Sequence, residues 1–405
     1  MEKKKPLILR IFLWFLTTAL ILIVAAVVTI FAIWHNEIMS FASLREIRAA
    51  DTDSGDGAVY EITVGGGFYL DKFIKQGGVS SDRELIEFVT RNLTKGLVDL
   101  GLESPTIGCS SFTAKSEDGK VLFARNYDYS KTNTCIVYTK AAKGRHATIS
   151  TVDLRFLGID TKKGITNLYD KITCLAATYV PLDGVNDAGV SCGIYMSYQG
   201  SSGAFPTNQE TDKPDFTSTT MLRLILDYAD NLDEAIEIAS SFDLHDSAGT
   251  SYHYMVADST GRSAILEWTC GTDATDHVGK KRTLSVIYND DDAYIGEMEG
   301  NSEHQWITNF IVLPDYYKDS PSSQKFGYDR YIKLSSELSE LSGTVRDERH
   351  AMELLRGVGR RSWSNDDANT VTAHSVVYNL TDRTALWVPN ENFDDETAYF
   401  ELKIK

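Results

Sequence analysis

Three residues that can take part in nucleophilic chemistry lie on the two strands of one predicted hairpin. Cys109 follows Gly108 and opens a strand-like segment, and Asp118-Gly119 is a strong turn signal. Arg125 and Asp128 lie in the strand-like segment after the turn. A two-residue turn predicts that Cys109 pairs with Asp128, so that a carboxylate lies beside the thiol. Strict alternation then puts Arg125 on the face opposite Asp128, unless a bulge or a strand end intervenes.

This arrangement suits a cysteine that uses its own α-amine as the general base. A free α-amine has a pKa of about 7.7 and can accept the thiol proton over a short path. Asp128 can orient the ammonium form, and Arg125 can stabilise the thiolate, which is the nucleophilic species. The chemistry requires Cys109 to be the first residue of a chain, and Gly108 leaves the preceding bond sterically open. We therefore predict cleavage of the Gly108–Cys109 bond.

The elements around this hairpin predict stacked layers. Further hairpins are expected across residues 183–188, 258–261 and 379–383, and helices across 222–229, 235–240, 328–341 and 346–358. Hairpins interrupted by pairs of helices favour sheets with helices outside them. Before Cys109 we predict a short strand at Val59–Val64 and an amphipathic helix from Ser81 to Leu100, with Ser81 and Glu84 as a capping box.

The motifs around Cys109 resemble the opening hairpin of the choloylglycine hydrolase family, also called linear amide C–N hydrolases. The resemblance rests first on Cys109-Ser110-Ser111-Phe112, Asp118-Gly119-Lys120 and Arg125-Asn126-Tyr127-Asp128-Tyr129. Later motifs are also similar to those of the family: the turn at 184–190, where Asp187 replaces a Glu, then Thr308-Asn309, and Tyr378-Asn379-Leu380-Thr381. The resemblance extends from Cys109 to about Val388.

This resemblance implies an α+β fold, the four-layer αββα sandwich of N-terminal-nucleophile hydrolases. The implied catalytic set is Cys109, Arg125, Asp128, Asn186, Asn309 and Arg330. Cys109 would be nucleophile and base, Arg125 and Asp128 would tune and position it, and the two asparagines would shape an oxyanion hole. Arg330 is a candidate for the family's late active-site arginine. The long segment before Cys109 is similar to the proenzymes of the family, acid ceramidase and N-acylethanolamine acid amidase, more than to bile salt hydrolases.

The N-terminus is a predicted membrane anchor. Basic residues precede an uncharged, mainly apolar run from Ile11 to Trp34, which at about 1.5 Å per residue can cross a hydrocarbon core of about 30 Å. The positive-inside rule then puts the bulk of the protein outside the cytoplasm. A cleaved signal, with Ser40-Phe41-Ala42 as its cleavage site, is the alternative and would make the protein secreted. We divide the chain into an anchor at 1–34, a linker and prosegment at 35–108, of which 35–56 is a tether, and a hydrolase domain at 109–405.

Composition argues against several other classes. The net charge of -17 argues against a nucleic-acid partner. None of the five cysteines forms a C-x-x-C pair, and whether Cys135, Cys174, Cys192 and Cys270 pair is left open. His245, His253 and His374 lack metal-binding spacing and are expected to be structural. We predict neither a metal nor a cofactor.

The predicted function is hydrolysis of a small N-acyl amide through an acyl-cysteine intermediate. An acyltransferase that uses the same intermediate is one alternative, and a membrane-tethered binding protein without chemistry is another. The substrate stays open among bile-acid conjugates, penicillin V, acyl homoserine lactones, N-acyl amino acids and fatty-acid amides. Oligomeric state is not predicted by these patterns.

Overall fold

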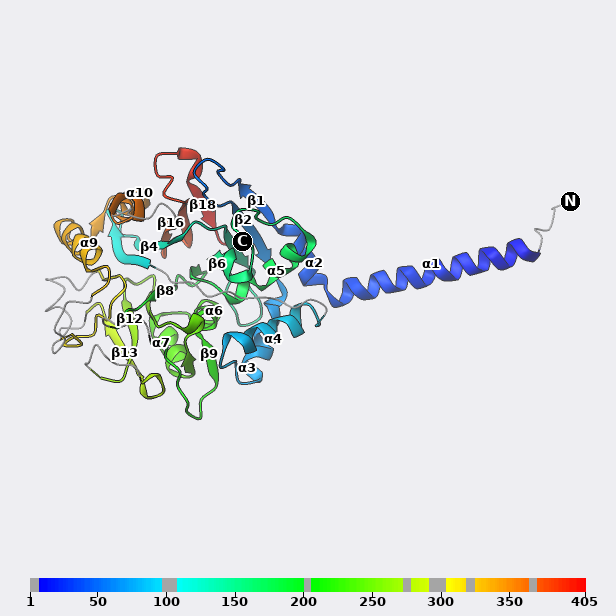
Figure 1. Cartoon of the computed structure of the whole chain (residues 1–405), viewed down its shortest axis with the longest axis horizontal. Helices are drawn as coiled ribbons and strands as arrows, with labels where there is room; N and C mark the ends of the chain where they lie inside the picture. Colours follow the sequence, from blue (N-terminus) through cyan, green and yellow to red (C-terminus); the bar gives the residue numbers. More distant parts are fainter. Residues whose placement is uncertain are drawn as a thin grey trace.

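A long N-terminal helix projects from a body built of two β-sheets and flanking helices (Figure 1). The computed structural model describes residues 7–96, 108–199, 205–271, 278–290, 304–317, 325–363 and 370–405. Helix α1 (Leu7–Ile33) has no buried residue, and its most apolar stretch has a mean hydropathy of 2.8. Within the described ranges it is the one helix long and apolar enough to cross a membrane, although a signal sequence would have the same features.

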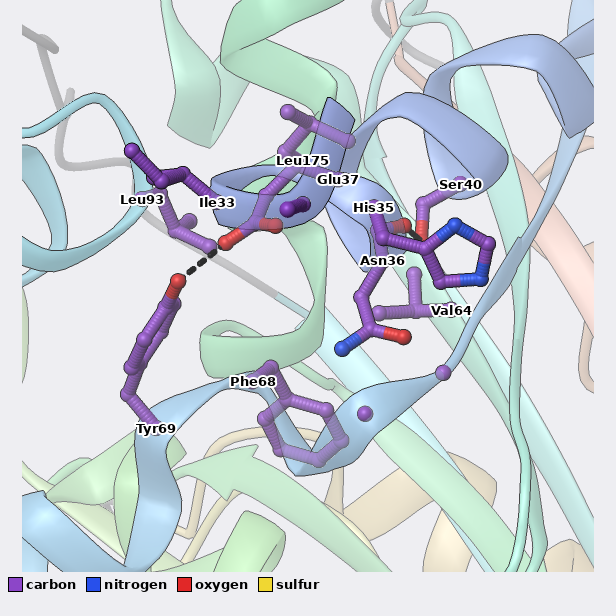
Figure 2. A pocket seen from close by; sticks show the side chains of 13 residues that line it. Ile33, His35, Asn36, Glu37, Ser40, Val64, Phe68, Tyr69, Leu93 and Leu175 are labelled. Atoms are coloured by element: carbon purple, nitrogen blue, oxygen red, sulfur yellow. Dashed lines mark hydrogen bonds between the residues drawn. The ribbon is translucent and has the colours of Figure 1, made fainter. Parts of the chain in front are cut away.

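The predicted tether at 35–56 is wrong, because this segment is structured and attached to the body. It contains α2 (His35–Ser43) and β1 (Arg45–Arg48). Tyr69 donates a hydrogen bond to the Glu37 carboxylate on α2, and Lys95 Nζ lies 2.6 Å from the Tyr69 hydroxyl (Figure 2). At the far end of α2, Ser43 Oγ accepts from the Thr63 amide at 2.8 Å. These partners are distant in sequence, so local patterns could not reveal them.

The larger sheet includes strands from both sides of the predicted cleavage site. Its order is β1, β2 (Val59–Val64), β5 (Thr134–Thr139), β6 (Thr148–Asp153), β7 (Asp183–Asn186), β8 (Ser191–Met196), β11 (Tyr252–Ala257), β12 (Ser263–Thr269) and β13 (Thr283–Tyr288). The predicted strand β2 is confirmed, and it pairs in parallel with β5 along its whole length. The predicted prosegment, residues 35–108, therefore supplies two strands of this sheet, β1 and β2.

The prosegment helix is shorter than predicted. In α4 (Asp82–Leu93) the Ser81 side chain accepts from the Glu84 amide, which confirms the N-terminal cap. The helix ends at Leu93, and Lys95 and Gly96 follow with positive φ values of 55° and 77°. Because these residues turn the chain out of the helix, the predicted end at Leu100 is wrong. Leu97, Leu100 and Gly101 lie outside the described residues. The short α3 (Leu70–Lys75) precedes α4.

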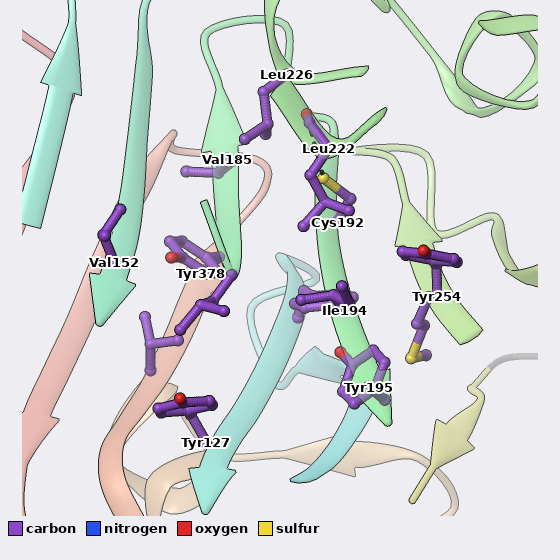
Figure 3. Close-up of a cluster of buried hydrophobic side chains, with 14 of the residues drawn as sticks. Tyr127, Val152, Val185, Cys192, Ile194, Tyr195, Leu222, Leu226, Tyr254 and Tyr378 are labelled. Atoms are coloured by element: carbon purple, nitrogen blue, oxygen red, sulfur yellow. Dashed lines mark hydrogen bonds between the residues drawn. The ribbon is translucent and has the colours of Figure 1, made fainter. Parts of the chain in front are cut away.

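The smaller sheet carries the hairpin of Cys109. Its order is β14 (Trp306–Ile307), β3 (Gly108–Ser116), β4 (Val121–Ser130), β16 (Thr370–Asn379), β17 (Thr384–Pro389) and β18 (Phe400–Lys403), with β15 (Thr344–Val345) also paired to β3. Tyr127 of β4 and Tyr378 of β16 reach the larger sheet (Figure 3). Their hydroxyls donate to Asp153 of β6 and Asp183 of β7 at 2.9 and 2.5 Å, so the two sheets are packed face to face.

Helices cover the outer faces of both sheets. On the larger sheet α6 (Ser218–Tyr228) contacts β7 and β8, and α7 (Leu232–Ser240) packs beside α6. On the smaller sheet α10 (Glu348–Gly357) contacts β4 and β16, and α9 (Tyr328–Glu340) contacts β3. The predicted αββα layering is confirmed. The hairpin expected across residues 183–188 is formed by β7 and β8, and its first strand begins at Asp183, after the 3-10 helix Cys174–Tyr179.

The predicted register of the β3–β4 hairpin is wrong by one residue. Cys109 pairs with Tyr127, and Asp128 pairs with Gly108. The loop has three residues instead of two, because the Ser116 amide bonds to the Lys120 carbonyl and Gly119 adopts a φ of 82°. A left-handed glycine at the third loop position is typical of a three-residue hairpin with a bulge. The shift puts the Cys109 and Arg125 side chains on one face of the sheet.

Candidate active site

The Cys109 thiol lies between the two sheets, beside the guanidinium of Arg125. Arg125 Nη2 lies 3.5 Å from Cys109 Sγ, and the thiol points to the Ile194 carbonyl at 3.8 Å. Both side chains are 0% exposed. Because directly opposite residues share a face, the observed pairing of Ser111 with Arg125 brings Arg125 to the Cys109 side. The structure thus brings together two of the predicted residues.

Arg125 is held from the larger sheet. It donates to the carbonyls of Leu182 and Ile194, and its Nη1 lies 3.3 Å from Asp183 Oδ2. Gly193 of β8 leaves space for it, since a Cβ there would lie 3.1 Å from Arg125 Nη1. The Tyr195 ring lies under the guanidinium, with 4.8 Å between the ring centroid and Cζ. The Arg125 guanidinium is therefore held in a fixed position, with its Nη2 directed at the Cys109 thiol.

Asp183 is a site residue that the sequence did not indicate. His374 Nε2 lies 2.8 Å from its Oδ2, and the Tyr378 hydroxyl donates to its Oδ1 at 2.5 Å. Burial tends to raise the pKa of Asp183, but His374 and Arg125 together hold it below its ordinary value. An ionised Asp183 compensates the buried charge of Arg125. No local signal marks this residue, since its partners come from two strands of the other sheet and are far away in sequence.

Burial also determines the protonation state of the Cys109 thiol. It raises the pKa of Cys109 to about 11 in the continuous chain, although Arg125 opposes the shift. A thiol with this pKa is almost wholly protonated at neutral pH. Removal of the thiol proton by an adjacent base is therefore needed before Cys109 can act as a nucleophile.

The main chain of Cys109 is surrounded by the other predicted polar residues. Asn309 Oδ1 accepts from the Cys109 amide at 3.0 Å. Arg330, on α9, donates to the Cys109 carbonyl at 2.6 Å, to Ser110 Oγ at 2.5 Å and to Asn309 Oδ1 at 2.7 Å. Arg330 therefore makes two hydrogen bonds to the Cys109–Ser110 segment and a third to Asn309. These contacts fix the position of the residue that would become the N-terminus.

Asp128 lies beside the Gly108–Cys109 bond instead of beside the thiol. Its Oδ2 lies 3.3 Å from Arg330 Nη1, and its Oδ1 accepts from Thr372 Oγ1 at 2.7 Å. A Cβ at Gly108 would lie 3.2 Å from the Asp128 Cβ, so glycine is the residue that leaves the carboxylate room. The expected conflict between Arg125 and Asp128 is resolved because the two act on different sides of Cys109.

The structure does not bring Asn186 to Cys109. Its Nδ2 donates to the Ala229 carbonyl at 2.8 Å, and its Oδ1 accepts from the amides of Ala188 and Val190. Asn186 is an odd number of residues from Asp183 and therefore points to the outer face of the sheet, about 10 Å further along the strand. The oxyanion role predicted for Asn186 is corrected to a structural role in the β7–β8 turn.

Two of the histidines support the site without touching the thiol. His374 holds Asp183, as described above. His253 lies 2.9 Å from Glu267 Oε1 through Nδ1 and 3.0 Å from the Thr308 carbonyl through Nε2. The same carboxylate accepts from the amides of Val312 and Leu313, so it orders the segment that presents Asn309. His245 bonds to Asn208 and Asp215, away from this site. All three histidines thus have hydrogen-bond partners within the fold.

No disulfide joins Cys135, Cys174 and Cys192, which are buried thiols. Across the described ranges, no three His, Cys, Asp or Glu side chains are grouped so that they could hold a metal ion. The described site offers a thiol, two guanidinium groups, two carboxylates and an amide. Such a set can polarise a carbonyl and stabilise a thiolate.

Comparison with known families identifies the class of this arrangement. Residues 109–272 match the family model described as linear amide C-N hydrolases, choloylglycine hydrolase family. The predicted family resemblance is confirmed. The match begins at Cys109 itself, and the activity that the family description supports is hydrolysis of linear amide C–N bonds. A search of curated proteins found no match.

Three solved structures align with the chain at low identity. A mutant of the conjugated bile acid hydrolase from Clostridium perfringens is 13% identical, with a TM-score of 0.47, over 73% of this chain and 92% of its own. Penicillin V acylase from Agrobacterium tumefaciens is 14% identical, with a TM-score of 0.43, over 69% and 83%. The N-acylethanolamine-hydrolyzing acid amidase ortholog from Caenorhabditis elegans is 16% identical, with a TM-score of 0.40, over 67% and 93%. These alignments assign neither substrate nor site residues to this chain.

Proposed function

We propose that the chain is a cysteine amidohydrolase that cleaves a small N-acyl amide, with Cys109 as the nucleophile. The observation that carries the proposal is the surroundings of this one residue. Its thiol lies 3.5 Å from Arg125, and its main-chain nitrogen lies 3.0 Å from Asn309 Oδ1. Cleavage of the Gly108–Cys109 bond would turn that nitrogen into an amine within reach of the thiol. The family match that begins at Cys109 supports this assignment.

The proposed reaction uses the new α-amine as both base and acid. The amine takes the thiol proton, and the thiolate attacks the amide carbonyl of the substrate. The resulting ammonium then protonates the leaving amine as the C–N bond breaks, which leaves an acyl thioester on Cys109. Water, deprotonated by the same amine, hydrolyses the thioester and releases the carboxylic acid. Arg125 stabilises the thiolate, Asp128 and Asn309 Oδ1 hold the amine as acceptors, and Arg330 holds the Cys109 carbonyl.

The negative oxygen of the tetrahedral intermediate needs a hydrogen-bond donor. Asn309 is the candidate amide closest to the Cys109 main chain, and its Nδ2 donates to the Met196 carbonyl at 2.9 Å in the uncut chain. We propose that it donates to the oxyanion in the cut enzyme, where one such donor contributes about 3–4 kcal/mol.

We propose that maturation is a self-cleavage. The Cys109 thiol attacks the Gly108 carbonyl, the acyl group shifts from nitrogen to sulfur, and water hydrolyses the thioester. The products are a Gly108 carboxylate and a free Cys109 amine. Cys109 is 0% exposed in the uncut chain, which supports the view that cleavage precedes substrate binding. Reactants held in contact have a large effective concentration, so a separate protease is not required.

The 1–108 piece would remain bound after cleavage. Strand β2 is hydrogen-bonded along its length to β5, and Leu85, Phe88 and Val89 of α4 are buried in the core. Separation would expose this apolar surface at about 25 cal/mol per Å². We propose that α1 is an uncleaved signal anchor and that the retained piece holds residues 109–405 at the extracytoplasmic face of the cell membrane.

Intact-mass measurement combined with a panel of N-acyl amides tests this function. Wild-type protein is expected to consist of two chains separated at Gly108–Cys109 and to release amine from at least one substrate. Cys109→Ala should stay uncut and inactive. Cys192→Ala removes another buried thiol and serves as the matched control, which should be cut and active.

Two results would contradict the assignment. An active wild-type chain that is still continuous through Gly108–Cys109 would exclude the amine mechanism. Cys109→Ala with activity within tenfold of wild type would exclude Cys109 as the nucleophile. Efficient cutting of Cys109→Ala would show that another protease makes the cut.

A further inference from the structure

An apolar groove lies where helix α1 meets the body of the protein. One wall is a single stripe that continues from α1 into α2, made by Ile30, Trp34, Ile38 and Phe41. The other wall comes from α5 (Leu168–Thr173) and the segment after it, through Leu168, Ile172 and Leu175. Leu93, Thr94 and Glu37 complete the lining. The cavity measures about 430 Å³. Sites for small molecules typically measure about 300–1,000 Å³, so the groove is large enough for a ligand.

The groove has a fixed shape because α2 is fastened to the body on its other side. The adjoining pocket in Figure 2 contains the hydrogen bond from Tyr69 to Glu37. Lys95 Nζ also lies over the Tyr69 ring, 4.2 Å from its centroid. These polar contacts hold α2 in place, so that the apolar stripe of α2 faces α5 and is not free to fold away.

The groove lies at one boundary of the proposed membrane span. Trp14 and Trp34 lie about 30 Å apart along the helix axis at about 1.5 Å per residue, which matches the thickness of a hydrocarbon core. Tryptophans are enriched at both boundaries of a membrane. With Trp14 at the inner boundary, Trp34 lies at the outer one. Figure 1 shows α1 leaving the body beside α2 and α5, so the same boundary passes along the groove.

The surface around the groove fits the edge of a lipid layer. On α5, Leu168 is 64% exposed and Tyr169 is 49% exposed. Lys171 Nζ lies 5.9 Å from the centroid of the Phe41 ring, which puts a cation at the rim. Large apolar side chains next to a cation suit the zone where acyl chains meet phosphate groups.

We propose that this groove binds one acyl chain of a lipid from the outer leaflet and thereby seats the hydrolase body on the membrane. The proposal rests on α1 being retained as a membrane span and is independent of the reaction at Cys109. Continuity with the span favours a lipid chain over a soluble ligand, because a wall of the groove is itself part of the membrane-facing stripe. The bound lipid would restrict how the body tilts against the bilayer.

Photo-cross-linking of the full-length protein tests this site. The protein is placed in phosphatidylcholine nanodiscs that contain a phosphatidylcholine with a diazirine near the carboxyl end of one acyl chain. After illumination, labelled peptides are mapped by mass spectrometry. Labels are expected on α5 and α2 as well as on α1. Ile172→Glu should lower labelling of α5 by about tenfold or more, because an unpaired carboxylate is strongly disfavoured in an apolar site.

Ile74→Glu is the matched control, since Ile74 is an exposed isoleucine on α3 outside the groove. It should leave labelling unchanged. Labelling confined to α1 in the wild-type protein would overturn the proposal, and so would an equal loss in both variants. If Ile172→Glu fails to fold, the positions of the labelled peptides in the wild-type protein alone test the proposal.

Discussion

Replacement of Arg330 tests the assembly of the site around the Cys109 main chain. Arg330→Ala removes the cation that contacts the carboxylate of Asp128 and the amide oxygen of Asn309. Its side chain is only 12% exposed, so solvent screens these contacts little. Hydrogen bonds to charged groups contribute about 1.5–3 kcal/mol each, so losing two predicts a barrier higher by about 3–6 kcal/mol. That corresponds to a fall in kcat/KM of about 10²–10⁴.

Arg330→Lys separates charge from geometry. Lysine keeps the positive charge but lacks the planar fork that reaches Asp128 and Asn309 at once. We expect kcat/KM to fall, but by less than in Arg330→Ala. Arg262→Ala is the matched control, because it removes an arginine that makes two hydrogen bonds to Asp233 on the exposed surface. Such exposed pairs contribute about 0–1 kcal/mol, and kcat/KM should stay within about twofold.

The assay measures amine release by the cut fraction of each variant, with the degree of cutting read from intact mass. Thermal unfolding monitored by circular dichroism controls for a loss of fold. A folded, cut Arg330→Ala enzyme with kcat/KM within about threefold of wild type would refute the reasoning, because a 3–6 kcal/mol effect could not be hidden in that range. A failure to cut would instead place Arg330 in maturation.

Three further variants probe other parts of the site. Asn186→Ala should lower the free energy of unfolding by about 1–3 kcal/mol through unpaired buried groups, with kcat within about threefold of wild type; a fall in kcat of about 10² in a stable variant would restore its oxyanion role. Asp183→Asn should cost about 3–5 kcal/mol of stability in urea unfolding, because the buried Arg125 loses its counter-charge; unchanged stability would show that main-chain carbonyls suffice. Glu391 accepts from the amide of Thr372, the residue whose hydroxyl donates to Asp128. Burial raises the pKa of Glu391 to about 6, so the wild-type protein loses stability as pH rises from 4.5 to 6. The stability of Glu391→Gln relative to wild type should therefore increase by about 2 kcal/mol across that window, and a flat or falling difference would contradict this sign.

Local patterns in the sequence were sufficient for much of the secondary structure. Ser81 caps α4 as its spacing with Glu84 predicts, because a cap involves only residues within one helical turn. That α1 is a candidate membrane span follows from length and composition alone. Cys109 and Arg125 were also recognisable, since both lie on one hairpin and their separation in sequence is short.

The register of that hairpin could be determined only from the structure. Asp118-Gly119 predicts a turn, but whether the loop contains two or three residues depends on the backbone angles of Gly119 and on the bond between Ser116 and Lys120. A change of one residue in the loop moves Asp128 from Cys109 to Gly108. The period of a strand is two, so this single step decides which side chains share a face.

Contacts between distant segments were decided by tertiary structure alone. Arg330 reaches Cys109 from α9, and Asp183 reaches Arg125 from the opposite sheet. Strand β2 joins the larger sheet from the other side of the predicted cleavage site. The sequence determined which residues could do the chemistry, because reactivity belongs to residue types and short motifs. Only the packing of the two sheets determined which of these residues come into contact, because burial and pairing are properties of the whole fold.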